Sequence, residues 1–372
     1  FEEGGDYQRP LYTSIKDAIK EESVINYLGV FGGIHLVNLP KNEQIDKNLI
    51  ITASVWVDDL SVKTTEVKEN ANLQQYVKRE IINLLINPVK GKTVDISDGK
   101  VMINQNGVKH RPYCNIISNR SFGTVVSDRA MNYTFYQNAR EFKLSEWTND
   151  IFAEAGEYII LTIDGKEYDL LAISNSCEFE RESATYFINT DDFSGNVKVT
   201  LSPKFAFKLV EVRLNIKDKK VASLAYIADI VAGIDKRTEK YIAVRRVDKR
   251  IFLRNPFAVS FSNLEIYLAS NVDYENIYED SKLFCVTKPI IGDGKECRVK
   301  FIFGTAHNMK VYEKHLKEAL EFGAYELSKS LRYEYNKALN YLKIKTPDNK
   351  LDFLVNEILG YQTLISRVWA KT

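Results

Sequence analysis

The residues most able to do chemistry gather between positions 119 and 150. Aromatic rings stand there among amide, basic and acidic side chains: Tyr133, Phe135, Tyr136, Trp147, Asn132, Asn138, Arg140, Lys143, Asn149 and Asp150. A sugar site needs this mixture, because an aromatic ring covers the C–H face of a pyranose while Arg, Asn and Asp bond its vicinal hydroxyls. The alternative is a turn-rich segment with aromatics in the core and polar groups in solvent, and composition alone favours that alternative.

Motifs for other chemistries are missing from the sequence. There is no G-x-S-x-G, no Gly-rich phosphate loop with a Lys and no H-E-x-x-H, and Gly292-Asp293-Gly294 is typical of a hairpin turn. The histidines and cysteines are His35, His110, His307, His315, Cys114, Cys177, Cys285 and Cys297. Their spacing matches no zinc site and no C-x-x-C pair. We therefore expect no metal, no cofactor and reduced thiols.

Composition excludes several classes of protein. The chain has 372 residues, which suggests two or three domains, and its 45% hydrophobic content is enough for buried cores. The formal net charge of +1 gives no sign of a nucleic-acid partner. No apolar run reaches the roughly 18 residues that a membrane span needs, and no signal peptide is visible. We expect a cytoplasmic protein.

The pattern along the chain predicts three parts. Residues 1–90 form a small mixed α/β segment, with helical spacing at 12–28 and 77–85, and a break at Asn87-Pro88 closes it. Residues 91–305 carry many strands spaced by turns with no helices between them, which predicts an antiparallel β-sandwich. Residues 306–372 return to helical spacing.

Two details of the strand pattern are specific. The run 157–163 is rich in β-formers and ends at Asp164-Gly165, a strong hairpin signal. Apolar residues change parity between Leu209 and Val210, which predicts a β-bulge. Further strands are expected at 221–231, 241–247, 264–269 and 298–303.

The last part predicts two helices. One long helix is expected over 309–342, and Thr346-Pro347-Asp348 has the form of a helix start with Thr at the N-cap. The second helix carries an apolar stripe: Leu351, Leu354, Val355, Ile358, Leu359, Ile365 and Trp369. We expect a helical domain downstream to cover this stripe. The chain opens on Phe1 rather than Met and is expected to be part of a longer protein.

The stretch 119–150 resembles the start of the β-domain of glycoside hydrolase family 94, the inverting glycoside phosphorylases. It is closest there to the cyclic β-1,2-glucan synthases and 1,2-β-oligoglucan phosphorylases. The matching residues are Asn119, Phe122, Gly123, Val126, Ser127, Tyr133, Thr134, Asn138, Arg140, Glu141, Leu144, Trp147, Asn149 and Asp150. The chain departs at 128–130, where the family has Glu-Ser-Gly, at Phe135 for Trp and at Ile151 for Pro.

The resemblance continues along the chain. Residues 246–256 are similar to the family's F-L-G-R-N stretch, and 289–304 to a later strand of its β-domain. Residues 346–372 resemble the entry into its catalytic barrel. In all, the resemblance covers 95–372 well and 1–94 loosely.

The resemblance implies a large β-sandwich, called a super-sandwich, followed by linker helices that lead into an (α/α)6 barrel absent from this sequence. It implies phosphorolysis of β-glucooligosaccharides to α-glucose 1-phosphate, with inorganic phosphate as co-substrate. Inversion by phosphate needs one protein carboxylate, which the family places in the barrel. We therefore assign no catalytic residue to this chain.

Carried over to this chain, the resemblance makes Asn138 and Arg140 the first candidates for sugar contacts. Lys143, Trp147, Asn149 and Asp150 follow as further candidates. Glu141 is expected to orient Arg140 through a salt bridge. The family's β-domain also mediates dimer contacts, so a homodimer is possible.

Two other readings stay open. The chain could be a stand-alone carbohydrate-binding or assembly module without catalysis, or an enzyme of another mechanism that shares this β-domain.

Overall fold

The computed structural model describes residues 94–97, 100–104, 112–130, 132–147, 155–217, 220–291, 296–340 and 342–366. The segments predicted over 1–90 lie outside the described residues, and so do Asn149 and Asp150. The three-part division of the chain stays a prediction.

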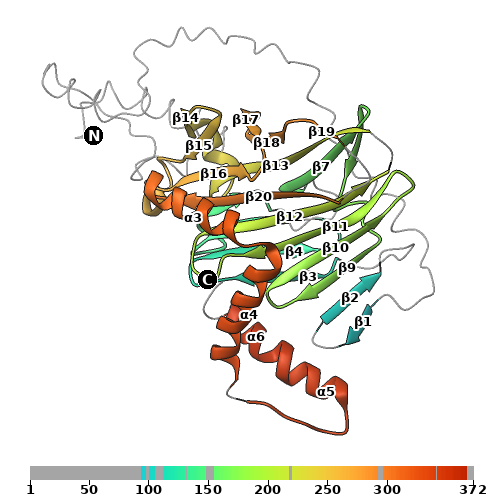
Figure 1. Cartoon of the computed structure of the whole chain (residues 1–372). Helices are drawn as coiled ribbons and strands as arrows, with labels where there is room; N and C mark the ends of the chain where they lie inside the picture. The colour runs from blue at the N-terminus through green and yellow to red at the C-terminus, as the bar shows by residue number, and fades with distance from the viewer. Residues whose placement is uncertain are drawn as a thin grey trace, which may run out of the picture. The chain divides into compact units, whose positions relative to one another are not determined.

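The described residues form two antiparallel sheets followed by helices (Figure 1). The first sheet contains, in spatial order, β1 (Val94–Ser97), β2 (Lys100–Asn104), β9 (Ser176–Glu180), β10 (Ser183–Asn189), β11 (Phe193–Leu201), β12 (Phe207–Ile216), β20 (Glu296–Ala306), β16 (Glu265–Ser270), β15 (Arg250–Arg254) and β14 (Ala243–Val247). This arrangement confirms the predicted antiparallel sandwich with C-terminal helices.

The second sheet follows the order β17 (Tyr274–Glu279), β18 (Lys282–Thr287), β13 (Val221–Gly233), β6 (Lys143–Ser145), β5 (Tyr133–Tyr136), β4 (Phe122–Ser127) and β3 (Cys114–Ser118). The long strand β13 also pairs with β19 (Ile290–Ile291) and β7 (Glu157–Ile163), and β7 pairs with β8 (Lys166–Asp169). Short 3-10 helices η3 (Lys236–Tyr241) and η4 (Val259–Phe261) lie in the connections between strands.

The predicted hairpin at 157–165 is confirmed. Strand β7 covers the predicted run and pairs with β8 across a two-residue turn. Asp164 and Gly165 both have positive φ, at 49° and 80°, as the tight hairpin turn requires.

The predicted bulge in β12 is wrong. The strand pairs with β11 and β20 from Phe207 to Ile216 without a shift in register. Both of its faces are buried: Val210 packs inside the sandwich, while Leu209 packs on the outer face under a helix. Because apolar residues of both parities are buried, the change of parity needs no extra residue.

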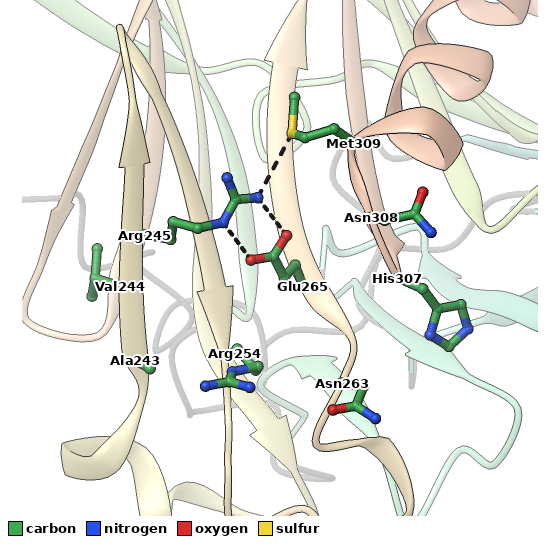
Figure 2. A pocket seen from close by; sticks show the side chains of 9 residues that line it. All are labelled: Ala243, Val244, Arg245, Arg254, Asn263, Glu265, His307, Asn308 and Met309. Atoms are coloured by element: carbon green, nitrogen blue, oxygen red, sulfur yellow. Dashed lines mark hydrogen bonds and ion pairs between the residues drawn. The ribbon is translucent and has the colours of Figure 1, made fainter.

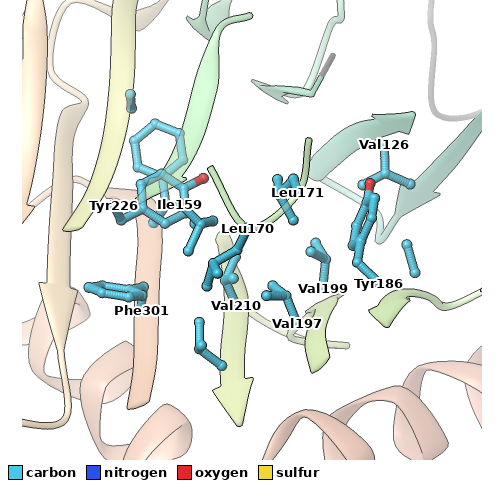
Figure 3. Close-up of a cluster of buried hydrophobic side chains, with 14 of the residues drawn as sticks. Val126, Ile159, Leu170, Leu171, Tyr186, Val197, Val199, Val210, Tyr226 and Phe301 are labelled. Atoms are coloured by element: carbon cyan, nitrogen blue, oxygen red, sulfur yellow. The ribbon is translucent and has the colours of Figure 1, made fainter. Parts of the chain in front are cut away.

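The sandwich interior is filled by apolar side chains from both sheets (Figure 3). Val126 and Ile159 of the second sheet lie across from Val199, Val210 and Phe301 of the first. At about 25 cal/mol per Å² of buried apolar surface, this layer is the main stabilising contribution to the fold.

One charged cluster interrupts this apolar layer. The Glu157 carboxylate accepts hydrogen bonds from Thr134 Oγ1 (2.6 Å), Ser145 Oγ (2.8 Å) and Tyr226 OH (2.9 Å). It also forms an ion pair with Lys208 of the opposite sheet. Burial alone would raise the pKa of Glu157, but Lys208 and the hydroxyl donors outweigh it and lower the pKa. The carboxylate therefore stays ionised in the core.

The predicted single helix over 309–342 is wrong, because the structure has α3 (Met309–Glu321) and α4 (Ala324–Leu339) with a break at Phe322 and Gly323. The sheet beneath fixes this break. Lys300 Nζ donates to the carbonyl oxygens of Ala319, Leu320 and Phe322, at the end of α3. Glu211 Oε2 accepts from the Ala324 N–H, at the start of α4. A cation at one helix end and an anion at the next favour two helices over one.

The last helical segment comprises α5 (Asn349–Phe353), the π-helical turn η5 (Leu354–Leu359) and α6 (Gly360–Leu364). Its predicted Thr346 cap is wrong. Asp348 is the N-cap and accepts from the Lys350 and Leu351 N–H groups, while Thr346 bonds the backbone of Asp348. The carboxylate reaches the first turn and leaves the threonine hydroxyl outside the helix.

The predicted apolar stripe of this segment is only partly covered within the described residues. Leu351, Leu354 and Leu359 are exposed, whereas Ile365 is buried. Among the described residues, no helix is both long enough and apolar enough to cross a membrane.

Breaking the buried ion pair should unfold the sandwich readily. Glu157→Gln leaves the Lys208 ammonium without its counter-charge and should cost about 3–5 kcal/mol of the free energy of unfolding, measured in urea. The double variant Glu157→Gln/Lys208→Met should cost less than Glu157→Gln alone. Asp273→Asn, in the exposed pair with Lys249, is the control and should change stability little. Equal losses for Glu157→Gln and Asp273→Asn would contradict this account.

His315 of α3 should make stability depend on pH. It is buried between Phe205 and Phe207 with Nδ1 2.8 Å from Tyr267 OH, and burial lowers its pKa from 6.5 to about 4. Between these two values the unfolded chain takes up a proton that the folded chain does not, so stability falls as pH falls. The contribution of His315 to the slope of the free energy of unfolding against pH is up to about 1.4 kcal/mol per pH unit. It should vanish in His315→Gln and persist in the exposed-site control His307→Gln. Identical slopes in the two variants would contradict it.

Candidate functional site

The β5–β6 turn carries most of the sequence-predicted site. It runs from Gln137 to Phe142, and Gln137 holds a left-handed φ of 57°. Asn138 Oδ1 accepts hydrogen bonds from the backbone N–H groups of Arg140 (2.9 Å) and Glu141 (3.0 Å). The Asn138 carbonyl accepts from the Phe142 N–H at 3.1 Å. Asn138 therefore shapes the turn, and its side-chain oxygen is already used by the backbone.

Arg140 is the side chain that this turn presents to solvent. Its side chain is 78% exposed, and its Nε lies 3.9 Å from Oε1 of Glu141, whose side chain is 48% exposed. An exposed pair at this distance stabilises little. The expected orientation of Arg140 by Glu141 is thus a loose contact, and the guanidinium fork is available to a ligand.

The remaining predicted residues are tied to the sandwich. Lys143 Nζ donates to the Ile234 carbonyl at 3.0 Å, which links β6 to the end of β13. Trp147 is half-buried and stacks on Tyr133 with ring centroids 4.9 Å apart. Tyr133 and Phe135 are buried, and burial raises the pKa of Tyr133 to about 12. These aromatic rings belong mainly to a small core cluster rather than to an open stacking surface.

A polar cleft of about 770 Å³ was not predicted. It lies where β14, β15 and β16 meet the start of α3, and Figure 2 shows its lining. The residues that line it are Ala243, Val244, Arg245, Arg254, Asn263, Glu265, His307, Asn308 and Met309. Its volume falls within the range of small-molecule sites.

Arg245 and Glu265 form the fixed part of this cleft. Arg245 Nε and Nη2 donate to the two Glu265 carboxylate oxygens at 2.6 and 2.5 Å. The same guanidinium lies 4.3 Å from the centroid of the Phe252 ring. This bidentate geometry holds both side chains in place and neutralises both charges.

The cleft and the β5–β6 turn are linked through η4. Phe261 packs against Phe142 with ring centroids 4.7 Å apart, and edge-on against Tyr136 at 6.1 Å. Asn263 of the cleft follows two residues later. The η4 segment thus contacts the turn through Phe261, and the chain continues from it to the cleft lining at Asn263.

Sequence reasoning missed the cleft, although one signal was available. Arg254 and Asn255 lie in the stretch 246–256 that resembles the family. Asn255 is buried and donates to the Ala232 carbonyl and Thr238 Oγ1, both at 2.9 Å, so it holds the loop. Arg254 is exposed. Asn263 and His307 lie beside Arg254 only because of the strand order, which the sequence pattern does not reveal.

Comparison with known proteins identifies the family. The sequence profile of the glycosyl hydrolase 94 supersandwich domain matches residues 99–284. The chain belongs to this family. It is also 24% identical over 314 residues to the cyclic β-(1,2)-glucan synthase NdvB of Rhizobium meliloti, a match that covers 70% of this chain and 11% of that protein. The chain thus spans about a tenth of this relative.

Solved structures give weaker matches. A proposed kojibiose phosphorylase from the human microbiome matches with a TM-score of 0.42 at 10% identity, over 68% of this chain and 39% of its own. A bacterial glucoamylase in complex with acarbose matches with a TM-score of 0.43 at 9% identity, over 72% and 44%.

The described residues hold no group of three His, Cys, Asp or Glu side chains that could bind a metal ion. This glycosyl hydrolase 94 domain offers two features to a ligand: the exposed Arg140 guanidinium on the β5–β6 turn and the polar cleft.

Asn138 should matter for stability. Asn138→Ala removes the acceptor of two backbone hydrogen bonds and should lower the free energy of unfolding by about 1 kcal/mol. Glu141→Ala, in the same turn but without a backbone bond from its side chain among the described contacts, should change it by less than about 0.5 kcal/mol. Chemical denaturation measures both, and equal effects would show that the Asn138 cap does not hold the turn.

Proposed function

We propose that the chain is the β-sandwich and linker-helix part of an inverting glucan phosphorylase, and that it binds β-glucooligosaccharides through the β5–β6 turn. Membership of the glycosyl hydrolase 94 family supports the reaction class. The observation that carries the binding role is Arg140, whose guanidinium is exposed on a turn fixed by Asn138. A planar fork of donors can bond two vicinal hydroxyls of a sugar.

In this proposal phosphate attacks the anomeric carbon of the terminal glucosyl unit. The bond to the glycosidic oxygen breaks, one carboxylic acid protonates that oxygen, and α-glucose 1-phosphate leaves. A downstream (α/α)6 barrel supplies the acid and the phosphate ligands. This chain holds the oligosaccharide and contributes to a dimer, and the protein works in the cytoplasm.

The other predicted contacts have different parts in this proposal. Trp147 supports the site from the Tyr133 cluster, and Lys143 fixes β6 against β13. Asn149 and Asp150 stay predicted ligands that lie outside the described residues. Arg140 is therefore the residue whose substitution best tests the proposed sugar binding.

Calorimetric titration with β-1,2-linked glucooligosaccharides tests the binding role. We expect the chain to bind, and Arg140→Ala to weaken the dissociation constant about tenfold or more, since hydrogen bonds from a charged donor are the strong ones. Arg246→Ala, another exposed arginine on β14, is the matched control and should bind as the parent chain does. The absence of heat in all three proteins would remove the proposal of a sugar site.

The catalytic half has its own test. The full-length protein that contains this chain should release α-glucose 1-phosphate only when phosphate is present. Release of free glucose by water would contradict phosphorolysis. Binding of the oligosaccharide without any turnover would favour the stand-alone module.

A further inference from the structure

The polar cleft at the β14–β16 edge contains a positively charged side chain without an ion-pair partner among the described residues. Its two arginines differ in this respect. Arg245 is matched by Glu265 through two hydrogen bonds. Arg254, the last residue of β15, is exposed, and its side chain makes no hydrogen bond or ion pair within the part of the chain that the structure describes. The cleft therefore presents one uncompensated guanidinium.

Most other polar groups of the cleft are donors or can act as donors. The His307 ring and the Asn263 and Asn308 amides line it together with Arg254. Asn308 Oδ1 accepts from the Val311 N–H at 3.0 Å, and its NH₂ group can donate to a ligand. The carboxylate in the lining, Glu265, is turned into its pair with Arg245 (Figure 2).

The lining also argues against a sugar ring as the main ligand. Its apolar members are Ala243, Val244 and Met309, and it contains no Phe, Tyr or Trp ring. The Phe252 ring, which contacts the lining residue Arg245, is covered by that guanidinium. A pyranose would find no large aromatic face to stack on, whereas an oxyanion would find a guanidinium together with amide and imidazole donors.

The elements around the cleft are rigid, which favours a defined site. Arg254 ends a strand that pairs with β14 on one side and β16 on the other. Asn308 is the N-cap of the 13-residue helix α3. Because strands and a capped helix fix the backbone positions of these residues, binding an anion would have to order their side chains only.

We infer that this cleft binds a phosphoryl oxyanion, either free phosphate or the phosphate group of a sugar phosphate, with Arg254 as its principal ligand. The lining shares no residue with the β5–β6 turn. It does not depend on the proposed oligosaccharide binding.

Calorimetry at constant ionic strength tests this inference. The chain is titrated separately with inorganic phosphate, glucose 1-phosphate and glucose. Phosphate or glucose 1-phosphate should bind, and Arg254→Gln should weaken the dissociation constant about tenfold or more. The matched control is Arg246→Gln, which removes the same charge from β14 outside the cleft lining and should leave binding within about twofold. Thermal unfolding of both variants checks that each is folded.

The outcomes separate cleanly. If phosphate and glucose 1-phosphate bind with equal affinity, free phosphate is a sufficient ligand. If glucose 1-phosphate binds more tightly and glucose gives no heat, the ligand is the sugar phosphate. Both outcomes support the site. Equal losses in Arg254→Gln and Arg246→Gln would reduce it to diffuse charge attraction and overturn it, as would no heat from either anion. Neutral β-1,2-glucooligosaccharides report on the Arg140 site instead, so the two proposals fail separately.

Discussion

The buried carboxylate of Glu157 joins the two strands that flank the proposed sugar-binding turn to the opposite sheet. It bonds Thr134 of β5, Ser145 of β6 and Tyr226 of β13, and pairs with Lys208 of the opposite sheet. Strands β5 and β6 are the two arms of the turn that presents Arg140. An ionised group in an apolar layer is costly unless every partner is in place, so its geometry is strongly specified. The position of the turn is therefore fixed by these contacts in the core.

A second charged pair does the same for the helices. Glu211 and Lys300 are register partners on β12 and β20. Both point to the outer face of the first sheet, where Lys300 meets the last carbonyls of α3 and Glu211 meets the first N–H of α4. The two ends are thus separated by the spacing between neighbouring strands.

The hairpin over 157–165 could be predicted because its signals are local. The run 157–163 ends at a turn whose residues accept positive φ, and both signals act locally. The β-bulge prediction for β12 failed because helices bury the second face of that strand. The periodicity of a strand does not show which segments, far away in the sequence, will cover it. The division of 309–342 into two helices has a local signal in Gly323, the N-cap of α4, whose N–H donates to Glu326. Lys300 and Glu211 reinforce the break from the sheet, and the helical spacing of the apolar residues does not reveal them.

In the candidate site too, the sequence predicted what depends on local residue types and missed what depends on contacts between distant segments. Residues 119–150 were identified from residue types, yet their roles follow from contacts: Asn138 is used by its own backbone, and Tyr133 by the core. What remains for a ligand is Arg140, which no other side chain holds closely. The sequence marks one residue of the cleft, Arg254, through the stretch 246–256. Asn263 and His307 join it through the order β15, β16 and β20. In this sandwich, residues that the fold leaves unsatisfied are better indicators of binding than residues of the right type, since a committed donor must break a bond before it can make another.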